Sequence, residues 1–97
     1  MNITKIEIKL AVANLFDNAL AGKDAHQIIG NVDIEVLPKS SKDRVDVFIA
    51  KADEGTTNFY DRPQDALLAR MEYLGSEKRY NEAVERATEV IYNNIGN

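Results

Sequence analysis

Cysteine is absent from the 97 residues of this chain. This absence excludes disulfides, thiolate metal ligands and thiol nucleophiles. A secreted domain of this size often needs disulfides, so we expect a protein of the cytoplasm, or of the host cytoplasm if a phage encodes it. The first residues, from Met1 to Glu7, carry charges where a signal peptide would be apolar, and we expect no such peptide.

Histidine and glycine are too sparse for the common catalytic and ligand-binding motifs. The one histidine, His26, cannot form a zinc site of the usual spacing without cysteine or a second histidine. The five glycines stand singly at positions 22, 30, 55, 75 and 96, so no glycine-rich phosphate loop is present. We therefore expect no catalytic residue, no metal and no cofactor, and a protein that is not an enzyme.

His26 leaves two interpretations open. It follows Asp24 by two residues, so a carboxylate could orient the imidazole as a general base. Alternatively, both side chains are solvated on a short polar link. The second interpretation is favoured because no serine motif or second histidine accompanies the pair.

Long apolar runs and an excess of basic residues are also absent. No segment approaches the roughly 20 apolar residues of a membrane-spanning helix. The 12 lysines and arginines are outnumbered by 16 aspartates and glutamates, which gives a net charge of −4. Nucleic-acid-binding modules usually carry a basic face instead. We expect no membrane contact and no direct binding of nucleic acid.

The residues that are present are typical of a globular protein, with 44% hydrophobic and 29% charged. A chain of this length suits one core, so we predict a small single α+β domain over residues 1–97. Its first element is a helix over residues 5–21. Thr4 and Glu7 form a capping-box pattern at its start, and Gly22 stands where a helix commonly ends.

The apolar period changes from 3.6 to 2 after this helix, which predicts strands. Residues 24–29 are predicted as one further helical turn that ends at Gly30. Two strands are expected at residues 32–37 and 45–50, and a third at residues 56–60. They would form a three-stranded antiparallel meander, which is marginal alone and needs a helical layer on one face.

The register of the first hairpin is predicted from its apolar residues. If the chain turns at Ser40 and Ser41, every apolar residue meets another on the same face. The predicted pairs are Val36 with Val45, Ile34 with Val47 and Val32 with Ile49.

Two helices are expected to complete the domain, in the order α-β-β-β-α-α. Pro63 suits the first turn of the earlier helix, whose apolar stripe would be Leu67, Met71 and Leu74. Gly75 and Ser76 would separate it from the last helix. The apolar side of the last helix consists of Tyr80, Ala83, Val84, Ala87, Val90, Ile91 and Ile95.

A candidate partner-binding patch lies on the face of the sheet away from the valines. The predicted registers place Asp33, Phe48 and Tyr60 in one row, and pair Leu37 with Arg44 further along. Aromatic residues beside a charge are typical of interface cores. The alternative is that the last helix covers this face, which would make Phe48 and Tyr60 ordinary core residues.

The first helix carries a second apolar strip, formed by Ile3, Ile6 and Leu10. Only one strip of a helix can lie flat on a small sheet. The second would contact either the terminal helix or another subunit, and we favour a subunit contact, hence a homo-oligomer.

These features favour an interaction protein without enzymatic activity. We expect a small bacterial or phage accessory or inhibitory factor that binds a partner macromolecule, most simply a protein. The alternative is an oligomer that binds or sequesters a nucleotide-like small molecule, for which Arg44, Arg62, Arg70 and the tyrosines would supply charge and stacking.

Overall fold

Four strands and two helices make up the described part of the chain, which comprises residues 2–39, 44–52 and 67–95 of a computed structural model. Their order is α1 (Lys5–Leu20), β1 (Ala25–Ile29), β2 (Val32–Pro38), β3 (Arg44–Lys51), β4 (Leu67–Leu74) and α2 (Glu77–Asn94). The predicted α+β class is confirmed, but the sheet has four strands instead of three and the order is α-β-β-β-β-α.

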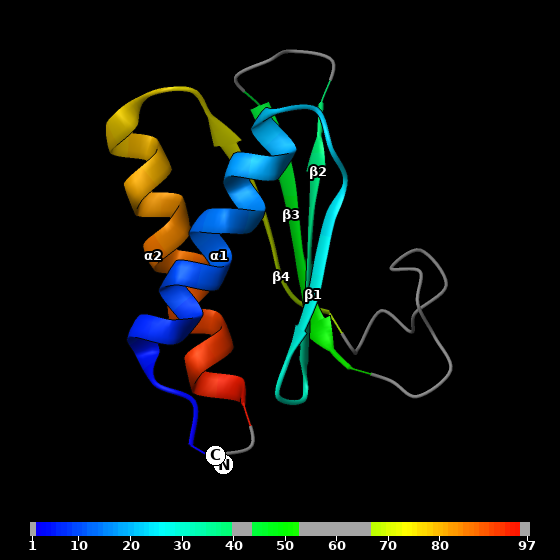
Figure 1. Ribbon diagram of the computed structural model, residues 1–97, viewed down its shortest axis with the longest axis vertical. Helices are drawn as coiled ribbons and strands as arrows, with labels where there is room; N and C mark the ends of the chain where they lie inside the picture. Colours follow the sequence, from blue (N-terminus) through cyan, green and yellow to red (C-terminus); the bar gives the residue numbers. More distant parts are fainter. Residues whose placement is uncertain (1, 40–43, 53–66, 96–97) are drawn as a thin grey trace.

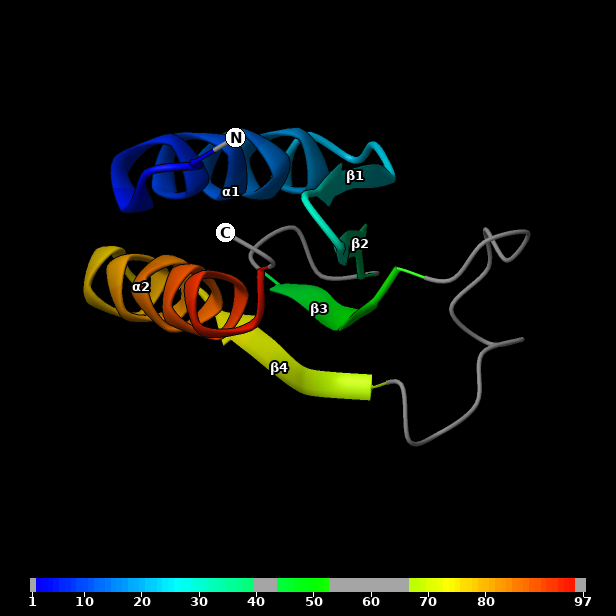
Figure 2. The same ribbon diagram turned by 90° about the horizontal axis from the view of Figure 1, so that it is seen from below.

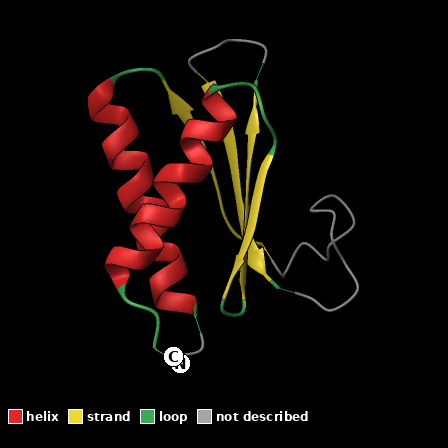
Figure 3. Cartoon of the chain, viewed as in Figure 1, coloured by secondary structure: helices red, strands yellow, loops and turns green. Residues whose placement is uncertain are grey.

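The four strands form an antiparallel meander with the spatial order β1-β2-β3-β4. Both helices lie on one face of this sheet, side by side and antiparallel (Figures 1 and 2). α1 packs mainly on β1 and β2, and α2 packs mainly on β4. The domain therefore has two layers, one helical and one of strands (Figure 3).

The first helix begins and ends as its sequence predicts. The Thr4 side chain accepts a hydrogen bond from the backbone N–H of Glu7, which satisfies a donor that the helix itself cannot pair. At the other end, Gly22 has a φ of 90° and donates to the carbonyl of Ala19, while Lys23 donates to Asn18. These two bonds form a Schellman motif. The motif favours glycine at the position of Gly22, because the residue after the helix C-cap adopts a left-handed conformation.

The helical turn predicted for residues 24–29 is wrong, because this segment is the edge strand β1. A two-residue turn, Gly30 and Asn31, joins it to β2, and Ile29 pairs with Val32 across the turn. Gly30 has a φ of 61°. A glycine with positive φ at the first central position is the requirement of a type II′ hairpin turn.

The β2–β3 hairpin is correct in its strands but wrong in its register. Val36 pairs with Val47 and Ile34 with Ile49, two residues further along β3 than predicted. The chain reverses between Lys39 and Arg44, where the backbone N–H of Lys39 donates to the Arg44 carbonyl. A shift of two residues keeps every side chain on its own face, so apolar matching alone could not distinguish the two registers.

The stretch predicted as a helix with the stripe Leu67, Met71 and Leu74 is instead the strand β4. Its pairing places Val45 opposite Tyr73 and Val47 opposite Met71. In β4, Ala69, Met71 and Tyr73 alternate with Arg70 and Glu72, which is the period of a strand. The predicted strand at residues 56–60 and the start of the predicted helix at Pro63 lie outside the described residues.

The last helix is confirmed, and it closes the core against α1 and the sheet. Ser76 caps it by accepting a hydrogen bond from the Arg79 backbone N–H. Phe16 packs edge-on against Tyr80 with ring centroids 5.8 Å apart, and Tyr73 completes the aromatic group.

In the described part of the chain, neither helix is long and apolar enough to cross a membrane. The largest fully buried apolar residues are Phe16, Ile8, Ile34, Ile49, Ile91, Val12, Val32, Val36, Val45 and Val47.

Candidate functional site

The candidate site is the face of the sheet that neither helix covers, which we call the helix-free face (Figure 2). Its side chains alternate along the strands with the buried aliphatic residues. Most are polar or charged, in contrast to the covered face. The residues placed there by the strand registers are His26, Ile28, Asp33, Glu35, Leu37, Arg44, Asp46, Phe48, Ala50, Arg70 and Glu72.

A cross-strand row of four residues crosses the middle of this face. His26 pairs with Glu35, Glu35 with Phe48, and Phe48 with Arg70. The guanidinium carbon of Arg70 lies 5.2 Å from the centroid of the Phe48 ring. This distance is within the range of a cation–π interaction. The row thus presents a flat cation stacked on an aromatic ring, with Phe48 half-buried and Arg70 exposed.

A cluster of charges lies beside the row, toward the β2–β3 turn. Arg44 Nη2 lies 2.6 Å from Glu72 Oε1, and Lys39 Nζ lies 3.2 Å from the same oxygen. Lys39 also lies 3.6 Å from Asp46. The hydrogen bond from Lys39, together with the charge of Arg44, lowers the pKa of the Glu72 carboxyl. Glu72 therefore stays ionised, and its charge is matched by two cations.

His26 and Asp33 contact each other on the same face, where His26 Nε2 lies against Asp33 Oδ1. Asp33 is fully buried, whereas the His26 side chain is 41% exposed. A buried carboxylate of this kind fixes the orientation of an imidazole ring. The contact leaves Nδ1 as the ring nitrogen through which His26 would meet a ligand.

The less favoured interpretation of the sequence paired His26 with Asp24, whereas the structure brings His26 to Asp33. β1 pairs with β2 in a register that places Ile28 opposite Asp33. Asp24 precedes this strand. His26 thereby reaches the carboxylate diagonally across the strands. The interpretation in which His26 is simply solvated is also incomplete, since the buried carboxylate of Asp33 contacts the ring.

The structure places four of the predicted partner-binding residues on the helix-free face. These are Asp33, Phe48, Arg44 and Leu37, while Tyr60 lies outside the described residues. The expected neighbours differ, because the two-residue shift places Asp33 opposite Ala50 and Leu37 opposite Asp46. The last helix lies on the other face, so the alternative in which it covers Phe48 is wrong.

The sequence analysis placed two residues of the row, His26 and Arg70, in the wrong elements, and each for a separate reason. His26 was assigned to a helical turn, although Gly30 and Asn31 between two apolar residues is a common hairpin signal. Arg70 was assigned to a helix, although it alternates with Ala69 and Met71. In both cases a strand period of two was present but short.

The predicted oligomer-contact residues separate into two groups. Ile3 is half-buried and packs against the core, near Gly30 and Ile95. Ile6 and Leu10 are 73% and 67% exposed. Ile6 and Leu10 are therefore not buried against the terminal helix, which was the alternative. The subunit contact stays a prediction.

In the described residues, no group of three histidine, cysteine, aspartate or glutamate side chains is arranged to hold a metal. Comparison of the chain with protein-family models, with curated proteins and with solved structures finds no match. A function is therefore inferred from the geometry of the surface.

Proposed function

We propose that this protein is a non-enzymatic interaction protein that binds a partner macromolecule through the helix-free face. Such a protein would serve as a small accessory or inhibitory factor in the cytoplasm of a bacterium or of a phage host. The observation that carries the proposal is the stacking of Arg70 on Phe48 at the centre of a face that both helices leave uncovered.

The chemistry of this face suits a protein partner. Aromatic residues and arginine are enriched among the residues that contribute most to binding, particularly near the centre of an interface. A stacked arginine has lost part of its conformational freedom before binding, so less entropy is lost on association. The charges beside the row, such as Asp46 and Glu72, form a polar border that would exclude poorly matched partners.

The experiment compares two variants that each remove one cation–aromatic pair. Phe48→Ala/Arg70→Ala removes the pair on the helix-free face. Lys5→Ala/Tyr92→Ala is the matched control, because Lys5 Nζ lies 5.7 Å from the Tyr92 ring centroid on the helical layer. Each protein is immobilised, exposed to a lysate of its source cells, and the retained proteins are quantified by mass spectrometry.

We expect wild type and control to retain the same macromolecule in similar amounts. The Phe48→Ala/Arg70→Ala protein should retain at least about tenfold less of it, as for an interface hot spot. Equal retention by all three proteins would contradict the proposal. Circular dichroism of each variant establishes that its fold is kept.

Self-association through α1 is the second part of the proposal. Ile6 and Leu10 stand one helical turn apart and are both largely exposed, and apolar side chains in this arrangement suit a helix-to-helix contact. Light scattering behind size exclusion should give a mass above that of the 10.9 kDa monomer. Ile6→Glu should return it to the monomer with its fold intact, whereas a monomeric wild type at micromolar concentration would exclude this part.

A nucleotide-like small molecule is the alternative ligand of the helix-free face. Arg44 and Arg70 both lie on it, and Phe48 supplies a ring for stacking; Arg62 lies outside the described residues. A ligand that binds the native state raises thermal stability. A rise in the unfolding temperature with ATP or GTP, lost in Arg70→Ala, would favour this alternative over a macromolecular partner.

A further inference from the structure

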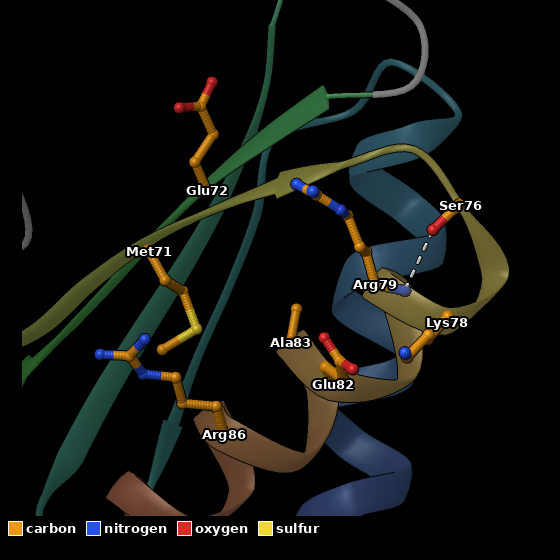
Figure 4. Close-up of a pocket in the computed structure, with 8 residues that line it drawn as sticks. All are labelled: Met71, Glu72, Ser76, Lys78, Arg79, Glu82, Ala83 and Arg86. Carbon is orange, nitrogen blue, oxygen red and sulfur yellow. Dashed lines mark hydrogen bonds between the residues drawn. The ribbon is translucent and has the colours of Figure 1, made fainter.

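A groove of about 490 Å³ lies between the second helix and the last strand, on the side of α2 away from α1 (Figure 4). Met71 and Ala83 bring apolar surface to it, and Arg79 and Arg86 leave α2 on the side that faces β4. The groove opens on the helical side of the sheet, to which Met71 points, and meets the helix-free face only at the β4 edge, where Glu72 borders both.

The helical wall of the groove has a regular pattern. Arg79, Ala83 and Arg86 follow one another at intervals of four and three residues, which places them on one flank of α2. The two arginines are exposed, and Ala83 between them is small and partly buried. The flank therefore offers a cation, a shallow apolar step and a second cation.

The charges of the groove are not balanced internally. Within the described residues, no carboxylate lies within ion-pair distance of Arg79 or Arg86. Two carboxylates line the groove beside Lys78, Arg79 and Arg86. Glu72 is already matched by Lys39 and Arg44, which leaves Glu82 alone against the three cations. The groove thus carries an excess of positive charge in a protein that is acidic as a whole, and this favours an acidic ligand.

The strand wall of the groove is an edge of the sheet. β4 pairs with β3 on one side, and among the described residues no strand pairs with its other side. About every second peptide group of an edge strand directs its N–H and C=O away from the sheet. These groups can hydrogen-bond to an added strand, as in domains that bind peptides by β-augmentation.

We propose that this groove binds an extended acidic peptide segment of a partner protein, which adds to β4 as a fifth strand. Side chains on one face of an added strand recur every second residue. Two glutamates four residues apart, with an apolar residue midway, would meet Arg79, Ala83 and Arg86 in turn. The motif that fits is glutamate-x-valine-x-glutamate.

The spacings agree closely enough for flexible side chains. Seven residues of helix separate the two arginines by about 10 Å along the axis. Four residues of strand separate the two glutamates by about 13 Å. The difference of about 3 Å is shared between two flexible arginine side chains, which can lean over that distance.

The opposite edge of the sheet does not offer the same chemistry. The hollow beside β1 measures about 300 Å³ and is lined by Glu7 and apolar or amide side chains, including Ile3, Ala11 and Gln27. It contains no basic residue. The acidic segment is therefore assigned to β4 rather than to β1.

The test uses a fluorescent nine-residue peptide that carries glutamate, valine and glutamate at alternate positions and threonine elsewhere. Fluorescence anisotropy measures its binding to the full chain. We expect saturable binding that weakens tenfold or more in Arg79→Glu/Arg86→Glu. Lys23→Glu/Lys51→Glu changes the net charge equally at exposed positions outside the groove, and it should bind within twofold of wild type.

Further measurements separate the outcomes. On titration with the peptide, NMR should show amide shifts along β4 and in α2 near Ala83, with β1 unchanged. The proposal is overturned by equal binding of a peptide with lysine in place of glutamate, by unchanged binding to Arg79→Glu/Arg86→Glu, or by shifts confined to β1. It is also overturned if ADP or inorganic phosphate occupies the groove while the peptide shows no saturable binding up to millimolar concentration.

Discussion

The two faces of the sheet are built from alternate residues of the same strands, yet they differ in almost every physical property. On the face under the helices, most side chains are apolar and buried, and Ile34, Val47 and Ile49 are fully buried. On the helix-free face, charged and aromatic side chains pair across the strands, as Arg70 does with Phe48. The comparison teaches that one face determines the fold, while the other can carry specificity without much effect on stability.

The largest expected difference between the faces comes from one substitution made on each. Ile34→Ser places a hydroxyl and a cavity in the core, and we expect a loss of about 3–5 kcal/mol in the free energy of unfolding. Ile28→Ser is its control, because Ile28 is 55% exposed on the helix-free face. It should cost about 1 kcal/mol or less.

Urea unfolding followed by circular dichroism measures both variants. Equal losses would mean that the two faces are assigned incorrectly or that the helix-free face is as important for folding as the covered one.

The His26–Asp33 pair is the exception on the helix-free face, because Asp33 is fully buried there. His26→Ala removes a partner of a buried carboxylate, and we expect a loss of about 1–3 kcal/mol. Gln27→Ala is the control, since Gln27 is the exposed neighbour of His26 on β1. If the two alanine variants unfold at the same urea concentration, the contact does not stabilise the folded protein.

Tyr80 makes the stability of the fold depend on pH in the alkaline range. Its burial, together with a 2.8 Å hydrogen bond to Asp17, raises its pKa to about 12. A raised pKa stabilises the fold fully below the unfolded value near 10, and this contribution is lost as the pH rises from about 10 to 12. Because Tyr80 is partly exposed, we expect this loss to be only about 1 kcal/mol.

The measurement is the pH dependence of urea unfolding for wild type and Tyr80→Phe. Wild type should lose more stability than the variant over this interval, since phenylalanine has no proton to release. Parallel curves would show that the hydroxyl titrates as it does in the unfolded chain.

The smallest effect is expected at the solvent side of the helical layer. Lys9 donates a hydrogen bond to Glu85 and thereby lowers the pKa of that carboxyl. The contribution to stability is present above the ordinary pKa of glutamate and is lost as the pH falls through the lowered value. Since both groups are exposed, we expect Lys9→Met to leave thermal unfolding at neutral pH almost unchanged.

NMR titration of the Glu85 carboxyl is the sensitive measurement of this pair. The pKa should return toward its ordinary value in Lys9→Met and stay lowered in Lys23→Met, which removes an exposed lysine that forms no ion pair with another described residue. A return in both variants would attribute the shift to net charge rather than to the hydrogen bond.

Elements with a long period or a definite cap could be predicted from the sequence. α1 and α2 each show several turns of apolar periodicity and a capping side chain, Thr4 and Ser76. β2 and β3 show three apolar alternations each. The face on which Asp33 and Phe48 lie followed from this alternation alone.

The remaining elements are short, and their periods are ambiguous. β1 has five residues, and Gln27 interrupts the apolar side of its alternation. In β4, Met71 fits both a helical stripe and a strand, and only pairing with β3 decides between them. The site residues His26 and Arg70 belong to these two strands, so the sequence could not bring them together with Asp33 and Phe48.

The division of roles between the two faces is tested most directly by side-chain NMR of the protein with the macromolecule that it retains from lysate. We predict that the partner shifts the ring resonances of Phe48 and the methyl resonances of Leu37, both on the helix-free face. The methyl resonances of Val12 and Ile91, in the core under the helices, should stay in place. Shifts confined to residues of the helical layer, with Phe48 unchanged, would contradict the proposed role of the helix-free face.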